Sequence, residues 1–340
     1  MKTRIILIIF SLGTVFQGFS QQDKHLSMFA EAPVFLNPAA AGFAPGNLQL
    51  FSNFRMQWTT VSNEPYRTMT AGADWKMMDK GNGFMGAGIN FTNDAAGVTN
   101  YQTNVIAVPV NYAILLNKSN LFSVGIQPAY YQRSVSTANA SWDNQWTGIE
   151  FDPTIDNQEA VPSQNYSLSK FDVSMGVYWE TFFSKYSKLT LGISGQHLTK
   201  QRINILTDDN GLYRKLNVHG QGSFGKMNST FTLEPAFMFF VQGPNKEFTF
   251  GSNYKFLLKS GSLITNYFND ITLSLGTYYR VGDAFMVNAI LDMSGLGFGA
   301  SYDFNMSSLT RATNGLGGME FFIRYRLQFG TGDLGNNRVH

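Results

Sequence analysis

Near its carboxyl end, the chain alternates between apolar and polar side chains. From position 319 to 329 the odd positions are apolar: Met319, Phe321, Ile323, Tyr325, Leu327 and Phe329. The even positions of the same stretch include Glu320, Arg324, Arg326 and Gln328. Because successive side chains of a β-strand point to opposite faces, this pattern predicts a strand with one apolar and one polar face.

The same alternation recurs along most of the chain, between turn signals. We expect strands near 47–58, 65–77, 83–93, 100–115, 121–134, 167–183, 188–201, 212–224, 230–241, 246–258, 269–281, 284–293, 296–305 and 317–329. After the first residues, no segment approaches the run of about 20 apolar residues that a membrane helix needs. Only 14% of residues are charged and 15% are aromatic, a balance that suits contact with lipid. Since only helices and closed barrels satisfy their backbone within a bilayer, we predict an all-β fold, a transmembrane outer-membrane β-barrel of about 14 antiparallel strands.

The chain begins with the features of a secretory signal peptide. Lys2 and Arg4 precede an apolar run, and small residues surround a cleavage site before Gln21. We therefore expect four parts, which are a signal peptide (1–20), an irregular amino-terminal segment (21–46), the barrel (47–329) and a carboxyl-terminal tail (330–340).

Charge and residue types argue against several classes of function. Without Lys2 and Arg4, the 25 basic residues become 23 and balance the 23 acidic ones, which speaks against a nucleic-acid partner. There is no cysteine, so no disulfide is expected. The four histidines, His25, His197, His219 and His340, lack metal-ligand spacing, and no nucleophile elbow or nucleotide loop is present. We predict no catalytic, metal-binding or cofactor-binding residues and no enzymatic activity.

Two local patterns receive structural interpretations. Paired glycines lie inside the expected strands: Gly86 and Gly88, Gly192 and Gly195, Gly220 and Gly222, Gly297 and Gly299. They indicate bending and close approach in a curved sheet, because a phosphate-binding loop would lead into a helix. The oxygen-rich run Thr207–Gly211 lacks the ligand spacing of a calcium loop, so we interpret it as a turn.

The stretch 21–46 follows neither helical nor strand periodicity and contains three prolines. Asn37 and Pro38 form a turn signal, and the small residues up to Gly42 permit close packing. We predict that this segment folds into the periplasmic mouth or the lumen. Arg55 and Gln57 lie on the lumen side of the first strand and are expected to hydrogen-bond it, with Trp58 in the same wall. A flexible tail is the alternative.

An acidic insertion, 135–166, interrupts the even spacing of the strands. It has no Lys or Arg, and it carries Trp142, Asp143, Trp146, Glu150, Asp152, Asp156 and Glu159. If both termini are periplasmic, the insertion follows the fifth strand and lies at the cell surface, where barrels have their long loops. It is either a partner-binding surface or a solvated loop. The 259–268 connection falls on the periplasmic side, yet it is not short.

Several motifs together resemble one known family. They are Gln22-Asp23, Ser27-Met28-Phe29, the run Phe35–Gly42 with Asn-Pro-Ala at its centre, and Phe54–Trp58 with its Arg-x-Gln-Trp pattern. They are similar to the PorP/SprF family of type IX secretion proteins of Bacteroidota. The resemblance implies an outer-membrane barrel, in contact with lipid, whose partners are the C-terminal domain of a surface adhesin and other type IX components. It also implies a role in gliding motility where the adhesin is a motility adhesin. Lys24, Glu31-Ala32 and the long acidic insertion depart from the family pattern.

Two hypotheses of different class remain, an anchor for a surface adhesin and a passive or ligand-selective pore. The pore hypothesis rests on basic residues that face the lumen, namely Lys215, Lys255, Arg280, Arg324 and Arg326. The irregular amino-terminal segment argues against it, because it would obstruct the channel.

Overall fold

The computed structural model describes residues 23–59, 64–78, 81–97, 99–136, 140–156, 158, 165–200, 211–226, 229–260, 270–307 and 310–328. The expected signal peptide (1–20), the tail (330–340), Glu159 and Thr207–Asn210 lie outside these residues.

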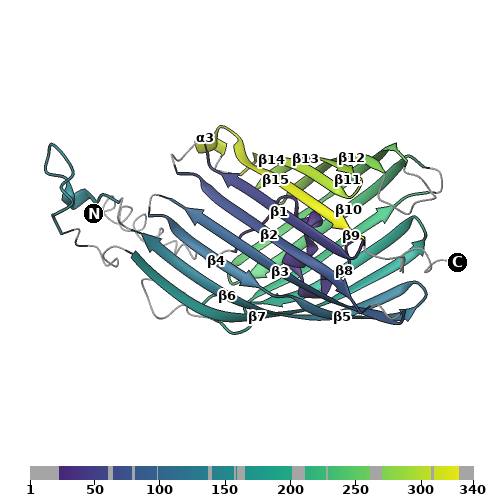
Figure 1. Ribbon diagram of the computed structural model, residues 1–340. Coiled ribbons are helices and arrows are strands. Elements are labelled where there is room, and N and C mark those ends of the chain that lie inside the picture. The colour runs from purple at the N-terminus through teal and green to yellow at the C-terminus, as the bar shows by residue number, and fades with distance from the viewer. Residues whose placement is uncertain are drawn as a thin grey trace, which may run out of the picture.

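In the part of the chain that the structure describes, fifteen antiparallel strands form one closed sheet (Figure 1). They are β1 Leu48–Gln57, β2 Tyr66–Met77, β3 Gly83–Ala96, β4 Tyr101–Ala107, β5 Val110–Asn117, β6 Asn120–Ser136, β7 Asn165–Ser184, β8 Ser187–Gln196, β9 Lys215–Phe224, β10 Phe231–Gln242, β11 Asn245–Lys259, β12 Ile271–Arg280, β13 Ala284–Met293, β14 Leu296–Asn305 and β15 Leu316–Leu327. The sheet closes because β1 pairs with β15 as well as with β2. Both β4 and β5 lie between β3 and β6, so these two of the fifteen strands make one crossing of the wall. The wall therefore has fourteen crossings, and the predicted barrel is confirmed.

The interruption between β4 and β5 falls at Val108 and Pro109. Proline has no N–H to donate to the ladder, which breaks the regular pairing at this point. Two backbone bonds bridge the break: Gly88 donates to the Pro109 carbonyl (2.9 Å), and Val108 donates to the Pro128 carbonyl (3.0 Å). The single strand predicted for 100–115 is therefore two strands in register.

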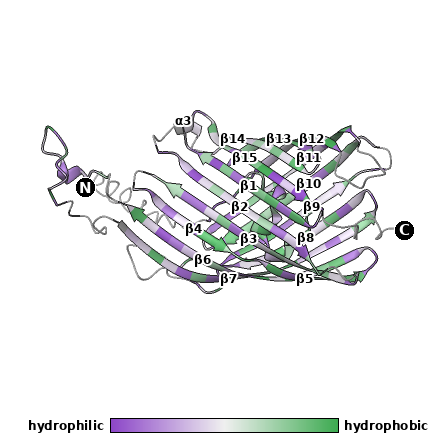
Figure 2. Cartoon of the chain, viewed as in Figure 1, coloured by the Kyte–Doolittle hydropathy of each residue, from purple (hydrophilic) through white to green (hydrophobic). Residues whose placement is uncertain are grey.

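Alternation along each strand separates the lumen from the outside. On β15, Glu320 is 0% exposed and its neighbour Phe321 is 50% exposed. On β1, Arg55 is buried and Phe54 is exposed. Figure 2 shows the same alternation as changes of colour along the strands. An apolar exterior around a polar interior is the arrangement of a membrane barrel. None of the helices in the described part of the chain is long and apolar enough to cross a membrane.

The two ends of the barrel differ in their connections. One end, which we call the loop end, carries the connections 137–164, 197–214 and 306–315. At the other end, the turn end, β1 begins and β15 ends, and 118–119, 185–186 and 294–295 are short turns. The connection 260–270 also lies at the turn end and is the long exception there. The β6–β7 connection extends well beyond the barrel at the loop end (Figure 1).

Residues 23–46, which we call the lumen segment, run inside the barrel and appear in purple in Figure 1. They contain three short helices, η1 Phe29–Glu31, α2 Pro33–Leu36 and η2 Pro38–Ala40. Pro33 and Pro38 each occupy the first position of a helix, where the missing N–H costs no hydrogen bond. Two further short helices lie in loop-end connections, η3 Asp143–Gln145 and α3 Thr310–Thr313.

The lumen segment crosses the barrel from the loop end to the turn end. The Asp23 amide donates to the side chain of Gln242, the last residue of β10, at 2.7 Å. Asn47, which follows the segment, donates its amide to the carbonyl of Leu327 at the end of β15 (2.8 Å). The surface placement of the acidic insertion assumed that both termini lie on one side, whereas Asp23, the first described residue, lies at the end opposite to the start of β1.

Apolar side chains of the lumen segment form the core of the molecule with the wall. Phe29 packs with Ala236, Met238, Phe240, Tyr278 and Met286. Phe43 contacts the rings of Phe84 and Tyr178 edge-on, with centroids 4.9 and 4.8 Å away. Full burial of a side chain such as Phe29 contributes about 1.5–3 kcal/mol, so the segment itself stabilises the filled lumen.

Candidate functional site: the lumen segment and its contacts

A track of glycines on the inner wall lets the lumen segment approach the backbone of the strands. A Cβ built on Gly176 would lie 2.1 Å from Asn37 Oδ1, and one on Gly86 would lie 2.2 Å from the Ala41 carbonyl oxygen. At Gly125 it would lie 2.6 Å from the Ala39 amide nitrogen. No side chain fits at these distances. The close approach that the sequence predicted for Gly86 is confirmed, and its partner is the lumen segment.

The side chain of Asn37 is 0% exposed, and both its oxygen and its nitrogen are hydrogen-bonded. Its Nδ2 donates to the Val177 carbonyl at 2.8 Å and to the Ile193 carbonyl at 3.3 Å. Its Oδ1 accepts from the amide of Ala39 at 3.0 Å, which caps the helix η2. One side chain therefore orders the turn and attaches it to β7 and β8.

Side chains of the wall satisfy backbone groups of the segment. Asn111 donates to the carbonyl oxygens of Ala39 (2.6 Å) and Ala41 (3.0 Å). The Gly42 amide donates to Asp74 Oδ1 at 3.0 Å. Irregular backbone inside a membrane protein requires such partners, because unpaired buried polar groups are costly.

Gln196 and Ser194 of β8 donate hydrogen bonds to backbone carbonyls of the segment that come just before Asn37. Gln196 Nε2 donates to the Phe35 carbonyl at 3.1 Å, and the Ser194 hydroxyl donates to the Leu36 carbonyl. The segment is thus hydrogen-bonded to β8 at successive residues.

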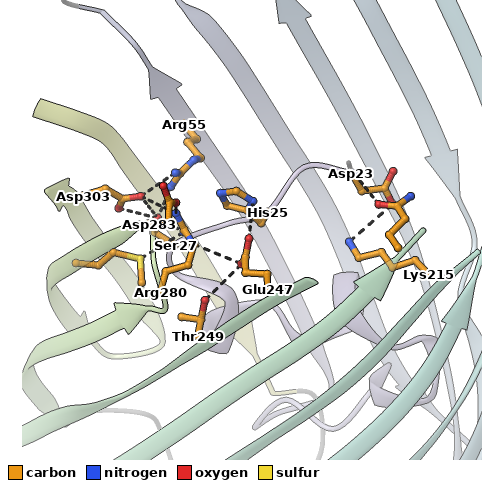
Figure 3. Close-up of polar contacts among 12 residues, drawn as sticks. Asp23, His25, Ser27, Arg55, Lys215, Glu247, Thr249, Arg280, Asp283 and Asp303 are labelled. Carbon is orange, nitrogen blue, oxygen red and sulfur yellow. Dashed lines mark hydrogen bonds and ion pairs between the residues drawn. The ribbon is translucent and has the colours of Figure 1, made fainter. Parts of the chain in front are cut away.

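A buried charge network holds the first part of the segment (Figure 3). Arg55 Nη2 lies 2.8 Å from Asp303 Oδ2, and Arg55 Nη1 lies 3.4 Å from Glu320 Oε2. Ser27 joins all three groups: its hydroxyl donates to Asp303 (2.7 Å) and accepts from Arg55, and its amide donates to Glu320 (2.6 Å). Each of these side chains is almost fully buried. The contacts among them therefore offset the cost of removing their charged and polar groups from water.

Arg280 extends this network toward His25. Arg280 contacts Glu247 (3.4 Å) and Asp303 (3.5 Å), and His25 Nδ1 lies 3.1 Å from Glu247 Oε2. Figure 3 shows these groups converging from several strands on the segment.

The basic residues of the pore hypothesis are all engaged. Lys215 lies 3.7 Å from Asp23, and Arg324 binds Glu31 and Asp292. Lys255 pairs with Glu234 (3.5 Å), and Arg326 donates to Gln49 (3.1 Å). Two of these partners, Asp23 and Glu31, belong to the lumen segment. The segment therefore neutralises charge in the lumen in addition to filling it.

Separate cavities remain on the two sides of the segment. One of about 130 Å³ lies toward the loop end and is bordered by Lys24, Tyr131 and Lys215. Another of about 290 Å³ lies toward the turn end and is bordered by Glu31, Asp74 and Arg326.

His197 fastens the start of the segment at the loop end. Its Nδ1 lies 2.6 Å from Asp172 Oδ2, and its Nε2 lies 2.6 Å from Asp23 Oδ2. Burial by itself would lower the pKa of His197, but the Asp23 and Asp172 carboxylates raise it to about 9. With a carboxylate on each ring nitrogen, the imidazole is a structural cation and has no free nitrogen to serve as a base.

The remaining residues named from the sequence take no part in the charge network around Arg55. Pro38 is buried in η2, and Gly42 adopts φ +75°, which favours glycine. The ring of Trp58 lies 4.7 Å from that of Tyr66, centroid to centroid and tilted by 42°, at the loop end of the wall. Gln57 borders the cavity around Arg55 and Asp303, and no hydrogen bond joins it to the described residues of the lumen segment.

The acidic residues of the insertion form a separate surface at the loop end. Asp143 and Gln145 bound the helix η3, and Trp146 contacts Phe151 with centroids 5.0 Å apart. Glu150 and Asp156 are exposed, and Asp152 and Trp142 are half-buried. None of the described residues of this connection contacts the lumen network through a hydrogen bond or ion pair.

Comparison with known families decides the identity of this plugged barrel. Residues 18–325 match the family described as type IX secretion system membrane protein PorP/SprF. The chain belongs to the PorP/SprF family. It is an outer-membrane barrel of the type IX secretion machinery, as the motifs around Asn37 and Arg55 predicted.

Solved structures support the same architecture. The toluene transporter TbuX of Ralstonia pickettii is 11% identical, with a TM-score of 0.50 over 88% of this chain and 94% of that one. The monoaromatic hydrocarbon channel CymD is 8% identical, with a TM-score of 0.51 over 88% of this chain and 93% of that one. At such low identity the likeness concerns the fold alone. A search of curated proteins gave no match.

Sequence reasoning missed several residues that hold the segment. Glu320 was recognised as facing the lumen, but its partner Ser27 lies 293 positions away. Asp74, Asn111 and Asp303 also lie on the lumen side of strands whose side chains alternate between polar and apolar. The sequence shows each of them as a polar residue on a lumen face, but it does not show which residue it contacts.

Proposed function

We propose that this PorP/SprF barrel is a non-enzymatic anchor that holds a surface adhesin through the adhesin's C-terminal domain and supports its export. The observation that carries the proposal is the occupied lumen. Residues 23–46 fill it, and Asp23 and Glu31 pair with the cations that would otherwise line a channel. A barrel closed in this way is suited to holding a partner at its rim rather than to passing solutes.

The orientation follows the usual rule for such barrels. Short turns face the periplasm and long loops face the cell surface, which places the loop end outside. The acidic β6–β7 connection then projects toward a surface partner. The turn end, with the cavity bordered by Glu31 and Arg326, faces the periplasmic components of the machinery.

Affinity purification from outer membranes tests the anchoring function. A tagged barrel, extracted in mild detergent, is expected to recover an adhesin C-terminal domain or type IX components. A tagged barrel of unrelated function from the same membranes is the control. Recovery of the barrel alone, or of the same proteins with the control, would contradict the proposal.

A pore is the competing function, and planar-bilayer conductance separates the two. The purified protein is expected to remain silent, because the segment separates the cavities at the two ends. Steady single-channel conductance from the intact protein would favour the pore.

A further inference from the structure

The acidic connection between β6 and β7 contains a small, self-supporting hairpin, residues 145–152, which we call the knuckle. Trp146 and Phe151 form an antiparallel bridge. The Thr147 amide donates to the Glu150 carbonyl (2.9 Å), and the Glu150 amide donates to Thr147 Oγ1 (3.2 Å). Gly148 adopts φ +96°, which allows the tight reversal at the tip.

The base of the knuckle is braced from within the connection. Gln145 is 7% exposed, and its Nε2 donates to the Ile155 carbonyl at 2.9 Å. Its Oε1 accepts from the Trp142 amide at 3.1 Å, and its carbonyl accepts from the Asp152 amide at 2.9 Å. A surface fixed in this way before binding loses less conformational entropy when a partner docks.

The knuckle exposes apolar side chains at its tip. Ile149 is 87% exposed, and Trp146 and Phe151 are each 49% exposed. Isolated exposed apolar residues are common, but this hairpin presents three within six positions, and two of them have their rings in contact. Because the connection extends beyond the barrel (Figure 1), membrane lipid does not explain this surface.

The surroundings of the tip are uniformly acidic. No Lys or Arg occurs between Arg133 and Lys170. Asp143, Glu150, Asp152 and Asp156 therefore share the connection with the apolar tip, and the connection contributes no cation. Such an acidic surface repels the phosphate groups of a membrane leaflet. It attracts a protein surface that carries Lys or Arg.

We propose that the knuckle is the anchor of the partner interface, with Ile149 and Trp146 inserted into an apolar pocket of a surface protein whose rim carries Lys or Arg. The inference rests on the proposed anchoring function. It goes further in naming the contact and the chemistry of the partner. Apolar anchors in a pocket dominate such interfaces, and rim charges set the rate and selectivity of association.

Photo-crosslinking in living cells tests the contact. A photoreactive amino acid in place of Ile149 is expected to give an adduct with an exported protein, at a peptide beside Lys or Arg. The same substitution at Val281, which is 52% exposed in the β12–β13 turn at the loop end, is the matched control and is expected to give none. An adduct with lipid or with a second copy of this chain, or no adduct, would overturn the proposal.

Affinity tests the energetics in the same proteins. The variant Ile149→Ser is expected to lower recovery of the crosslinked protein at least tenfold, and Val281→Ser to leave it unchanged. Heat-modified electrophoretic mobility shows whether each variant is a folded barrel. If Ile149→Ser still recovers the adhesin fully, the anchoring function stands and the knuckle proposal is wrong. If the Ile149 adduct is an exported protein other than an adhesin and the tagged barrel recovers no adhesin, the knuckle proposal stands and adhesin anchoring is wrong.

Discussion

At the scale of single residues, the glycine track explains how an irregular segment fits against a regular wall. The substitution Gly176→Ala places a methyl group only 2.1 Å from Asn37 Oδ1, so either the Asn37 side chain or the strand has to move. We expect this to destabilise the seated segment by about 1–3 kcal/mol, as overpacking does elsewhere. Limited proteolysis of the purified barrel should then cut at Lys24 several-fold faster.

Gly195→Ala is the matched control for this prediction. Its new methyl group would meet only the flexible end of Leu198, at 3.3 Å. Equal cleavage rates in the two variants would mean that the track does not hold the segment.

The His197 contact makes the hold on the segment depend on pH. The pKa of His197 is raised to about 9, above its ordinary value of 6.5, so its contribution is complete below pH 6.5 and is lost as pH rises through 9. The whole shift corresponds to about 3 kcal/mol, and the hold on the segment is the part of it that comes from Asp23, because Asp172 stays with the wall. Proteolysis at Lys24 should therefore accelerate between pH 6.5 and 9.5, and this acceleration should disappear in His197→Gln. A pH-independent rate in the unaltered protein would show that this contact does not hold the segment.

At the scale of elements, the lumen segment and the barrel wall have separable roles. The pairs Arg55–Asp303 and Arg324–Asp292 join strands to strands, so the wall keeps them when the segment is removed. Lys215 and Arg324 would lose their partners Asp23 and Glu31. We expect a variant without residues 23–46 to fold and to conduct, with a preference for anions. Planar-bilayer recording checks this, and a silent but folded deletion variant would show that other parts close the barrel.

The strands were predictable because their signal is local. Period-two alternation gave the fourteen crossings and the two faces, since it needs only neighbouring residues. The departures are local as well. β8 ends at Gln196 rather than near 201, because His197 has φ +57°, which is incompatible with a strand. Pro109 divides the predicted strand 100–115 because it lacks an N–H.

At the scale of the whole molecule, the contacts of the lumen segment were beyond prediction from one sequence. Asn37 was identified as an ordering residue, but its wall partners lie 140 and 156 positions away. Ser27 meets Asp303 at a separation of 276 positions. Such pairs depend on how the closed barrel brings distant strands around one segment, and no spacing along the chain records that arrangement.

The path of the segment predicts an unusual placement of the amino-terminal end. Asp23 contacts Gln242, His197 and Lys215, which all lie at the loop end, whereas β1 begins at the turn end. If the loop end faces outward, Asp23 lies at the cell-surface end and the chain passes inward from there through its own barrel to β1. A short epitope placed directly before Asp23 should bind antibody on intact cells, as should one placed in the β6–β7 connection. An epitope after Leu327 should become accessible only after the outer membrane is permeabilised. If the amino-terminal epitope also needs permeabilisation while the β6–β7 epitope does not, the segment enters its barrel from the periplasmic side.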